Sequence, residues 1–191
     1  MGGGPAGVMP MEAFPAAEVM QAFAGKIYRL GDQAGIGSTV KMVNQHLAGV
    51  HIATACEAMA LGMRAGADPK QLYEVICNSA GMSWMFQNRV PHILEGDYTP
   101  LSAVNIFVKD LGLVVDAAKA QTYPAPIANA AYLRFLATTA KGLGKLDDSA
   151  VMRSWLMRLV LSGQWRASPE SAFTCCSKAK RGSSSSGCGS R

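Results

Sequence analysis

Residues 31–67 read GDQAGIGSTVKMVNQHLAGVHIATACEAMALGMRAGA, and this stretch decides the fold. It opens with a glycine-rich turn, and Ser38 then offers a good helix N-cap. From Ser38 to Arg64 there are about 27 residues without a proline, enough for roughly 40 Å of α-helix. Small or apolar residues fill most sides, which predicts a long helix buried at the centre of the domain. The apolar positions at helical spacing include Val40, Val43, Leu47 and Val50.

Polar side chains interrupt the start of this helix. Lys41 is followed by Asn44 and Gln45, three and four positions on, so the three share a helix face. A lysine here can extend its charged end to solvent along an apolar surface. Alternatively, it lies at the edge of a cleft, where the neighbouring amides hold a polar ligand and the lysine exchanges a proton with a substrate hydroxyl. The pattern alone leaves both interpretations open.

A second lysine, Lys109, interrupts another apolar face. It is adjacent to Asp110, so one interpretation is a charge pair on a solvated edge. The other is a cation that binds a phosphate, a carboxylate or an electron-rich cofactor.

The rest of the chain to about residue 160 predicts shorter helices and an all-α domain. Asp68 and Ser83 are good N-caps for helices over 69–79 and 83–95, and Pro91 should kink or divide the second. Further helices are expected over 101–120, 127–141 and 149–161. The polar and aromatic cluster in the second helix is interpreted as capping and packing: Ser83, Trp84, Asn88 and Arg89.

The pattern predicts three segments. Residues 1–30 have a glycine- and proline-rich start, a short helix over 12–24 and a short strand at 26–30, KIYRL. Residues 31–162 form the helical domain. Residues 163–191 are serine-rich and basic without helical periodicity, so we expect a disordered tail.

No metal site is predicted. His46 and His51 are five residues apart, which does not place both on one helix face, and H-E-x-x-H is absent. Asp147 and Asp148 are interpreted as a helix cap.

Charge and cysteine content exclude some classes of function. The tail past residue 163 carries +4 of the net charge of +5, so the helical part is nearly neutral and a folded nucleic-acid surface is not expected. The longest apolar runs are too short to span a membrane. The five cysteines lack C-x-x-C spacing, and Cys56 and Cys77 are predicted to be small buried apolar residues. This cysteine pattern favours a reducing compartment, the cytoplasm.

Three segments carry a resemblance to a known family. They are GIGSTVKMVNQHLAGVHIATACEAMAL, SAGMSWMFQNRVPHILEGDYTPLSAVNIFVKDLGLV and GLGKLDDSAV. Over residues 26–152 the chain resembles the C-terminal domain of the β-hydroxyacid dehydrogenases, the 3-hydroxyisobutyrate dehydrogenase family, and is most similar to its L-threonate dehydrogenase branch.

The resemblance implies a helical domain like the second half of 6-phosphogluconate dehydrogenase, placed behind a Rossmann domain that binds NAD or NADP. It implies that Lys41 is the catalytic lysine, that Asn44 and Gln45 contact a small hydroxy-acid substrate, and that Lys109 of the K-D-L motif contacts the cofactor. Many members carry Asn where this chain has Gln45.

The resemblance also implies that residues 1–30 are a remnant of the Rossmann domain, so the chain is expected to be a fragment with little activity alone. The alternative is a non-catalytic oligomerisation module in which the long helix forms the spine of a dimer. A homo-oligomer is expected in either case.

Overall fold

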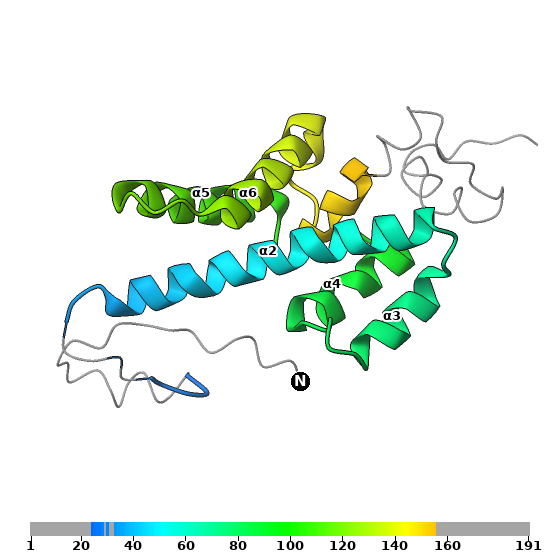
Figure 1. Ribbon diagram of the computed structural model, residues 1–191, viewed down its shortest axis with the longest axis horizontal. Coiled ribbons are helices and arrows are strands. Elements are labelled where there is room, and N and C mark those ends of the chain that lie inside the picture. The colour runs from blue at the N-terminus through cyan, green and yellow to red at the C-terminus, as the bar shows by residue number, and fades with distance from the viewer. Residues whose placement is uncertain (1–23, 29, 31–32, 156–191) are drawn as a thin grey trace, which may run out of the picture.

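The computed structural model of the chain describes residues 24–28, 30 and 33–155. A single long helix, α2 (Ile36–Arg64), runs through the middle of the molecule (Figure 1). The predicted all-α fold is confirmed, and no strand forms among the described residues. The other elements are α3 (Pro69–Cys77), α4 (Trp84–Glu95), α5 (Val104–Ala120), α6 (Pro126–Thr138), the π-turn η1 (Thr139–Leu143) and the 3₁₀ turn η2 (Asp148–Ala150).

Helix α2 begins at Ile36, and its N-cap lies three residues earlier than predicted. Gly35, rather than Ser38, is the N-cap, and its φ of +92° lies in the left-handed region that glycine adopts without strain. The Gly35 carbonyl accepts hydrogen bonds from the backbone N–H of Thr39 at 3.0 Å and from its hydroxyl at 3.2 Å. The turn therefore starts the helix through backbone geometry, without a side-chain cap.

Helices α5 and α6 pack on one side of α2, and α3 and α4 lie on the other (Figure 1). A Cβ at Gly49 of α2 would lie 2.9 Å from a methyl carbon of Leu111, so the missing side chain lets α5 approach closely. The centre of the core is formed by fully buried side chains from four helices, among them Ile52, Met59, Val90, Leu111 and Phe135.

The prediction that α2 is buried along its length is wrong for its first half. Apart from Gly37, its buried residues start at Ala48. Val40, Val43 and Leu47 are 37%, 49% and 51% exposed. The first half extends past α3 and α4, so those helices cannot cover it (Figure 1).

Pro91 does not divide α4, which continues from Trp84 to Glu95. A proline has no N–H to donate to the carbonyl four residues earlier, which here belongs to Gln87. The Tyr73 hydroxyl of α3 donates to that carbonyl at 3.1 Å. A side chain from the neighbouring helix thus replaces the hydrogen bond that proline removes.

Other boundaries differ by a few residues from those predicted. Residues 24–28 and 30 form no strand, because a strand needs a partner and the described residues offer none. The Asp68 and Ser83 caps are confirmed by their hydrogen bonds to the backbone N–H groups of Gln71 and Phe86. The predicted 12–24 helix lies almost wholly outside the described residues, as do the 163–191 tail and the end of the last helix. Within the described residues, no helix has the length and apolar character needed to cross a membrane.

Candidate functional site

The predicted site residues lie on two helices that pack together. Lys41, Asn44 and Gln45 belong to the second and third turns of α2, and Lys109 belongs to α5. Lys41 and Asn44 are exposed, whereas Gln45 is half-buried. Lys41 and Gln45 lie on the same face of α2 as the buried residues Ala48 and Ile52, at helical spacing. This face therefore continues beyond the hydrophobic core, where it becomes polar.

One carboxylate joins the two helices at this site. Nε2 of Gln45 donates to Oδ2 of Asp110 at 2.7 Å. Nζ of Lys109 lies 3.2 Å from the other oxygen of the same carboxylate. Nδ2 of Asn44 donates to Oε1 of Gln45 at 3.2 Å. The structure therefore brings Asn44, Gln45 and Lys109 into one polar chain through Asp110.

Burial differs sharply along this polar chain. The side chain of Asp110 is 13% exposed and that of Lys109 is 69% exposed. The Lys109 ammonium thus has donors left for a ligand while Asp110 is largely enclosed. Lys41 makes no hydrogen bond or ion pair with any described residue, so its ammonium is open to a ligand from outside this part of the chain.

A groove is found elsewhere, between α3 and α4. Its lining includes Lys70, Tyr73, Cys77 and Gln87, and it contains none of the predicted site residues.

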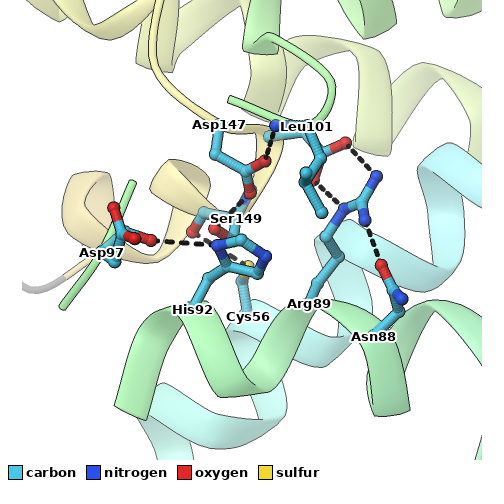
Figure 2. Close-up of polar contacts among 9 residues, drawn as sticks. Cys56, Asn88, Arg89, His92, Asp97, Leu101, Asp147 and Ser149 are labelled. Atoms are coloured by element: carbon cyan, nitrogen blue, oxygen red, sulfur yellow. Dashed lines mark hydrogen bonds and ion pairs between the residues drawn. The ribbon is translucent and has the colours of Figure 1, made fainter. Parts of the chain in front are cut away.

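A second polar cluster is buried between α4 and the segments that carry Leu101 and Asp147 (Figure 2). Nε and one terminal nitrogen of Arg89 donate to the two carboxylate oxygens of Asp148 at 2.6 and 3.2 Å. Another terminal nitrogen of Arg89 donates to the side-chain oxygen of Asn88. Asp147 accepts from the backbone N–H of Leu101 at 2.9 Å and from the N–H and hydroxyl of Ser149 at 3.0 and 2.6 Å. This cluster fixes the loop before α5 and the η2 turn against α4.

The predicted helix cap is confirmed for Asp147 only, because Asp148 instead forms the buried ion pair with Arg89. Burial raises the pKa of Asp148 to about 6, although the Arg89 guanidinium acts in the opposite direction. Burial also acts to raise the pKa of Asp147, but the hydrogen bonds from Ser149 and Leu101 and the charge of Arg89 hold it below its usual value.

Cys56 is confirmed as a buried thiol, whereas Cys77 is only half-buried. Burial raises the pKa of Cys56 to about 12, so the thiol stays protonated and packs as a small apolar group.

The described residues contain no group of three or more His, Cys, Asp or Glu side chains that could hold a metal ion. For a nicotinamide dinucleotide, the exposed ammonium of Lys109 fits a contact with an electron-rich group of the cofactor.

This helical fold is that of an enzyme family that uses a nicotinamide cofactor. Residues 35–155 match the profile described as NAD-binding of NADP-dependent 3-hydroxyisobutyrate dehydrogenase, and the chain belongs to this family. The family supports NAD or NADP as the cofactor.

Among curated proteins, the chain is similar to L-threonate dehydrogenase of Cupriavidus necator. It is 61% identical over 145 residues, which cover 75% of this chain and 49% of that protein. It is also similar to 2-(hydroxymethyl)glutarate dehydrogenase of Eubacterium barkeri, at 36% identity over 72% of this chain and 46% of that protein.

Among solved structures, 3-hydroxyisobutyrate dehydrogenase from Salmonella typhimurium superposes with a TM-score of 0.70 at 54% identity. The match covers 72% of this chain and 48% of that one. The chain thus spans about half the length of the relatives that it matches.

Asp110 is the residue of this site whose role was not predicted from the sequence. One of the two interpretations of Lys109 pairs it with Asp110 on a solvated edge; the ion pair forms, but the Asp110 side chain is only 13% exposed. The contact with Gln45 joins residues 65 positions apart, and spacing along one helix cannot reveal such a contact.

Proposed function

We propose that this chain supplies the helical, substrate-binding half of an NAD(P)-dependent dehydrogenase acting on L-threonate-like hydroxy acids. The observation that carries the proposal is the polar chain from Asn44 through Gln45 and Asp110 to Lys109. It lies next to Lys41 on the same helix, whose ammonium has no partner among the described residues. The similarity to L-threonate dehydrogenases supports the substrate class.

Each side chain has a role that follows from its chemistry. In oxidation, the amine of Lys41 takes the proton of the substrate hydroxyl as the carbon–oxygen double bond forms, and in reduction the ammonium returns it. The amides of Asn44 and Gln45 hold the remaining oxygens of the substrate. Lys109 binds the cofactor, which when bound supplies the site that accepts or donates the hydride.

The chain alone is expected to have little turnover, because most contacts to a dinucleotide come from a Rossmann domain in this class of enzyme. We place the protein in the cytoplasm, the reducing compartment that its cysteine content favours.

Calorimetric titration of the full chain with L-threonate tests the substrate site without requiring turnover. We expect binding to the wild type and an affinity about tenfold lower for Lys41→Ala, a loss of about 1.4 kcal/mol. The control is Lys70→Ala, which removes an exposed lysine of α3 outside the site and should leave the affinity unchanged. Equal affinities of wild type and Lys41→Ala would contradict the role of Lys41.

A second candidate is a non-catalytic oligomerisation module. It is favoured by the exposed apolar stripe on the first half of α2, formed by Ile36, Val40, Val43 and Leu47. Light scattering on the titrated samples separates the two candidates. A stable dimer that binds no L-threonate would favour the module, whereas binding favours the substrate-binding half and is compatible with a homo-oligomer.

A further inference from the structure

The orientation of the Gln45 amide is determined by Asp110. An ionised carboxylate can accept hydrogen bonds but cannot donate them, so the NH₂ end of Gln45 must face Oδ2 of Asp110. The carbonyl end of Gln45 then accepts from Nδ2 of Asn44 at 3.2 Å. Reversing the Gln45 amide would place two acceptors together at Asp110 and two donors together at Asn44.

The same constraint decides which groups face a ligand. Once these bonds are made, Oδ1 of Asn44 and one N–H on each amide have no partner among the described residues. The free acceptor, Oδ1 of Asn44, can accept a hydrogen bond from a hydroxyl group of a hydroxy acid. The two free N–H groups can donate to its hydroxyl and carboxylate oxygens.

The hydrogen bond between Gln45 and Asp110 has the properties of a strong positioning interaction. Its length of 2.7 Å is that of a charge-assisted hydrogen bond, and the Asp110 side chain is only 13% exposed. Lys109 holds the other carboxylate oxygen at 3.2 Å, which limits rotation of the carboxylate. The amides on α2 and the cation on α5 are therefore held in one arrangement.

We propose that Asp110 is a positioning residue that orients the amides of Gln45 and Asn44 for the substrate and couples them to Lys109. This inference rests on the proposed function for the identity of the ligand. The orientation of the amides is a property of the chain itself and can be measured without any ligand.

The test is NMR of the side-chain amides in the full chain, comparing wild type with Asp110→Asn. The Gln45 NH₂ signals are assigned by their loss in Gln45→Ala. We expect the hydrogen-bonded proton of Gln45 to resonate downfield in the wild type and to move upfield in Asp110→Asn, with a smaller shift for Asn44. The affinity for L-threonate should fall about tenfold in the same variant.

Asp116→Asn is the matched control, because it makes the same change at an exposed aspartate on the same helix. It should leave both the amide signals and the affinity unchanged. Melting temperatures show whether the two variants are equally folded. A further variant, Asp110→Ala, removes the acceptor altogether, in case the amide oxygen introduced by Asp110→Asn still accepts a bond from Gln45.

The outcomes separate this inference from the proposed function. Gln45 signals that do not respond to either Asp110 variant would overturn the positioning role. Signals that respond in a chain that does not bind L-threonate would support the orientation by Asp110 and overturn the substrate assignment. If a variant has altered Gln45 signals but an unchanged affinity for L-threonate, the claim that the amide orientation contributes to substrate binding would be overturned.

Discussion

At the scale of single residues, the structure surrounds its buried carboxylates with partners. Asp148 is fully buried and accepts two hydrogen bonds from Arg89. Asp110 is partly buried; one of its oxygens accepts a hydrogen bond from Gln45, and the other forms an ion pair with Lys109. Removing one member of a buried ion pair is costly because the other is left without compensation.

The sequence predicted residue chemistry where the signal was local. Lys41, Asn44 and Gln45 were grouped by their spacing on one helix, and the structure places them on successive turns of α2. The pairing of Arg89 with Asp148 and that of Gln45 with Asp110 could not be predicted, because they join residues 59 and 65 positions apart. The assignment of the three α2 residues to catalysis and binding stays a prediction until it is measured.

The raised pKa of Asp148 predicts how stability changes with pH. Its value of about 6 in the folded chain exceeds the ordinary 3.8, so between these values the folded chain holds a proton that the unfolded chain has lost. The contribution of Asp148 to stability therefore falls as pH rises from about 4 to about 6, by at most about 1.4 kcal/mol per pH unit.

Denaturant unfolding of wild type and Asp148→Asn across this pH range measures the effect. The free energy of unfolding of the wild type minus that of the variant should decline as pH rises and level off near neutral pH. A difference that is constant or that increases would contradict the raised pKa. Asp147, whose pKa is lowered, acts in the opposite direction and loses its contribution as pH falls toward and below its ordinary value of 3.8.

At the scale of secondary structure, the helices were predictable from periodicity and caps, but some of their ends were not. The Asp68 and Ser83 caps follow from side-chain chemistry that is visible in the sequence. The start of α2 depends on a left-handed backbone at Gly35, and several glycines in residues 31–37 could have provided it. The continuation of α4 through Pro91 depends on Tyr73, a residue of another helix.

The hydrogen bond from Tyr73 to Gln87 predicts a specific coupling. Tyr73→Phe should lower the free energy of unfolding by about 1 kcal/mol, because it leaves the Gln87 carbonyl without its donor. In a Pro91→Ala background the same substitution should cost close to nothing, since the new N–H can bond to Gln87 within the helix.

A double-mutant cycle by denaturant unfolding measures this coupling. The ring of Tyr73 stacks on Phe86 with centroids 6.1 Å apart, and phenylalanine retains that contact in both backgrounds. Equal costs in the two backgrounds would show that Tyr73 does not compensate for the proline.

At the scale of the whole molecule, the hydrophobic pattern predicted one domain around a long helix but overestimated how much of that helix is covered. The apolar spacing of Val40, Val43 and Leu47 indicates a buried face, yet these side chains are exposed in the described chain. The spacing of apolar residues in a sequence shows that one face of a helix is apolar, but it does not show which part of the protein covers that face. The chain spans only about half the length of the relatives that it matches.

We propose that Lys41 is the catalytic lysine of a hydroxy-acid dehydrogenase. The most direct measurement is the turnover of L-threonate by a hybrid enzyme. In this hybrid, residues 35–155 of this chain replace the matching region of the Cupriavidus necator L-threonate dehydrogenase, to which the chain is 61% identical over 145 residues. We predict NAD(P)-dependent turnover by the hybrid and a loss of about 10²- to 10⁴-fold in kcat for its Lys41→Ala variant. A Lys41→Ala hybrid that turns over L-threonate as fast as the unmodified hybrid would contradict the account.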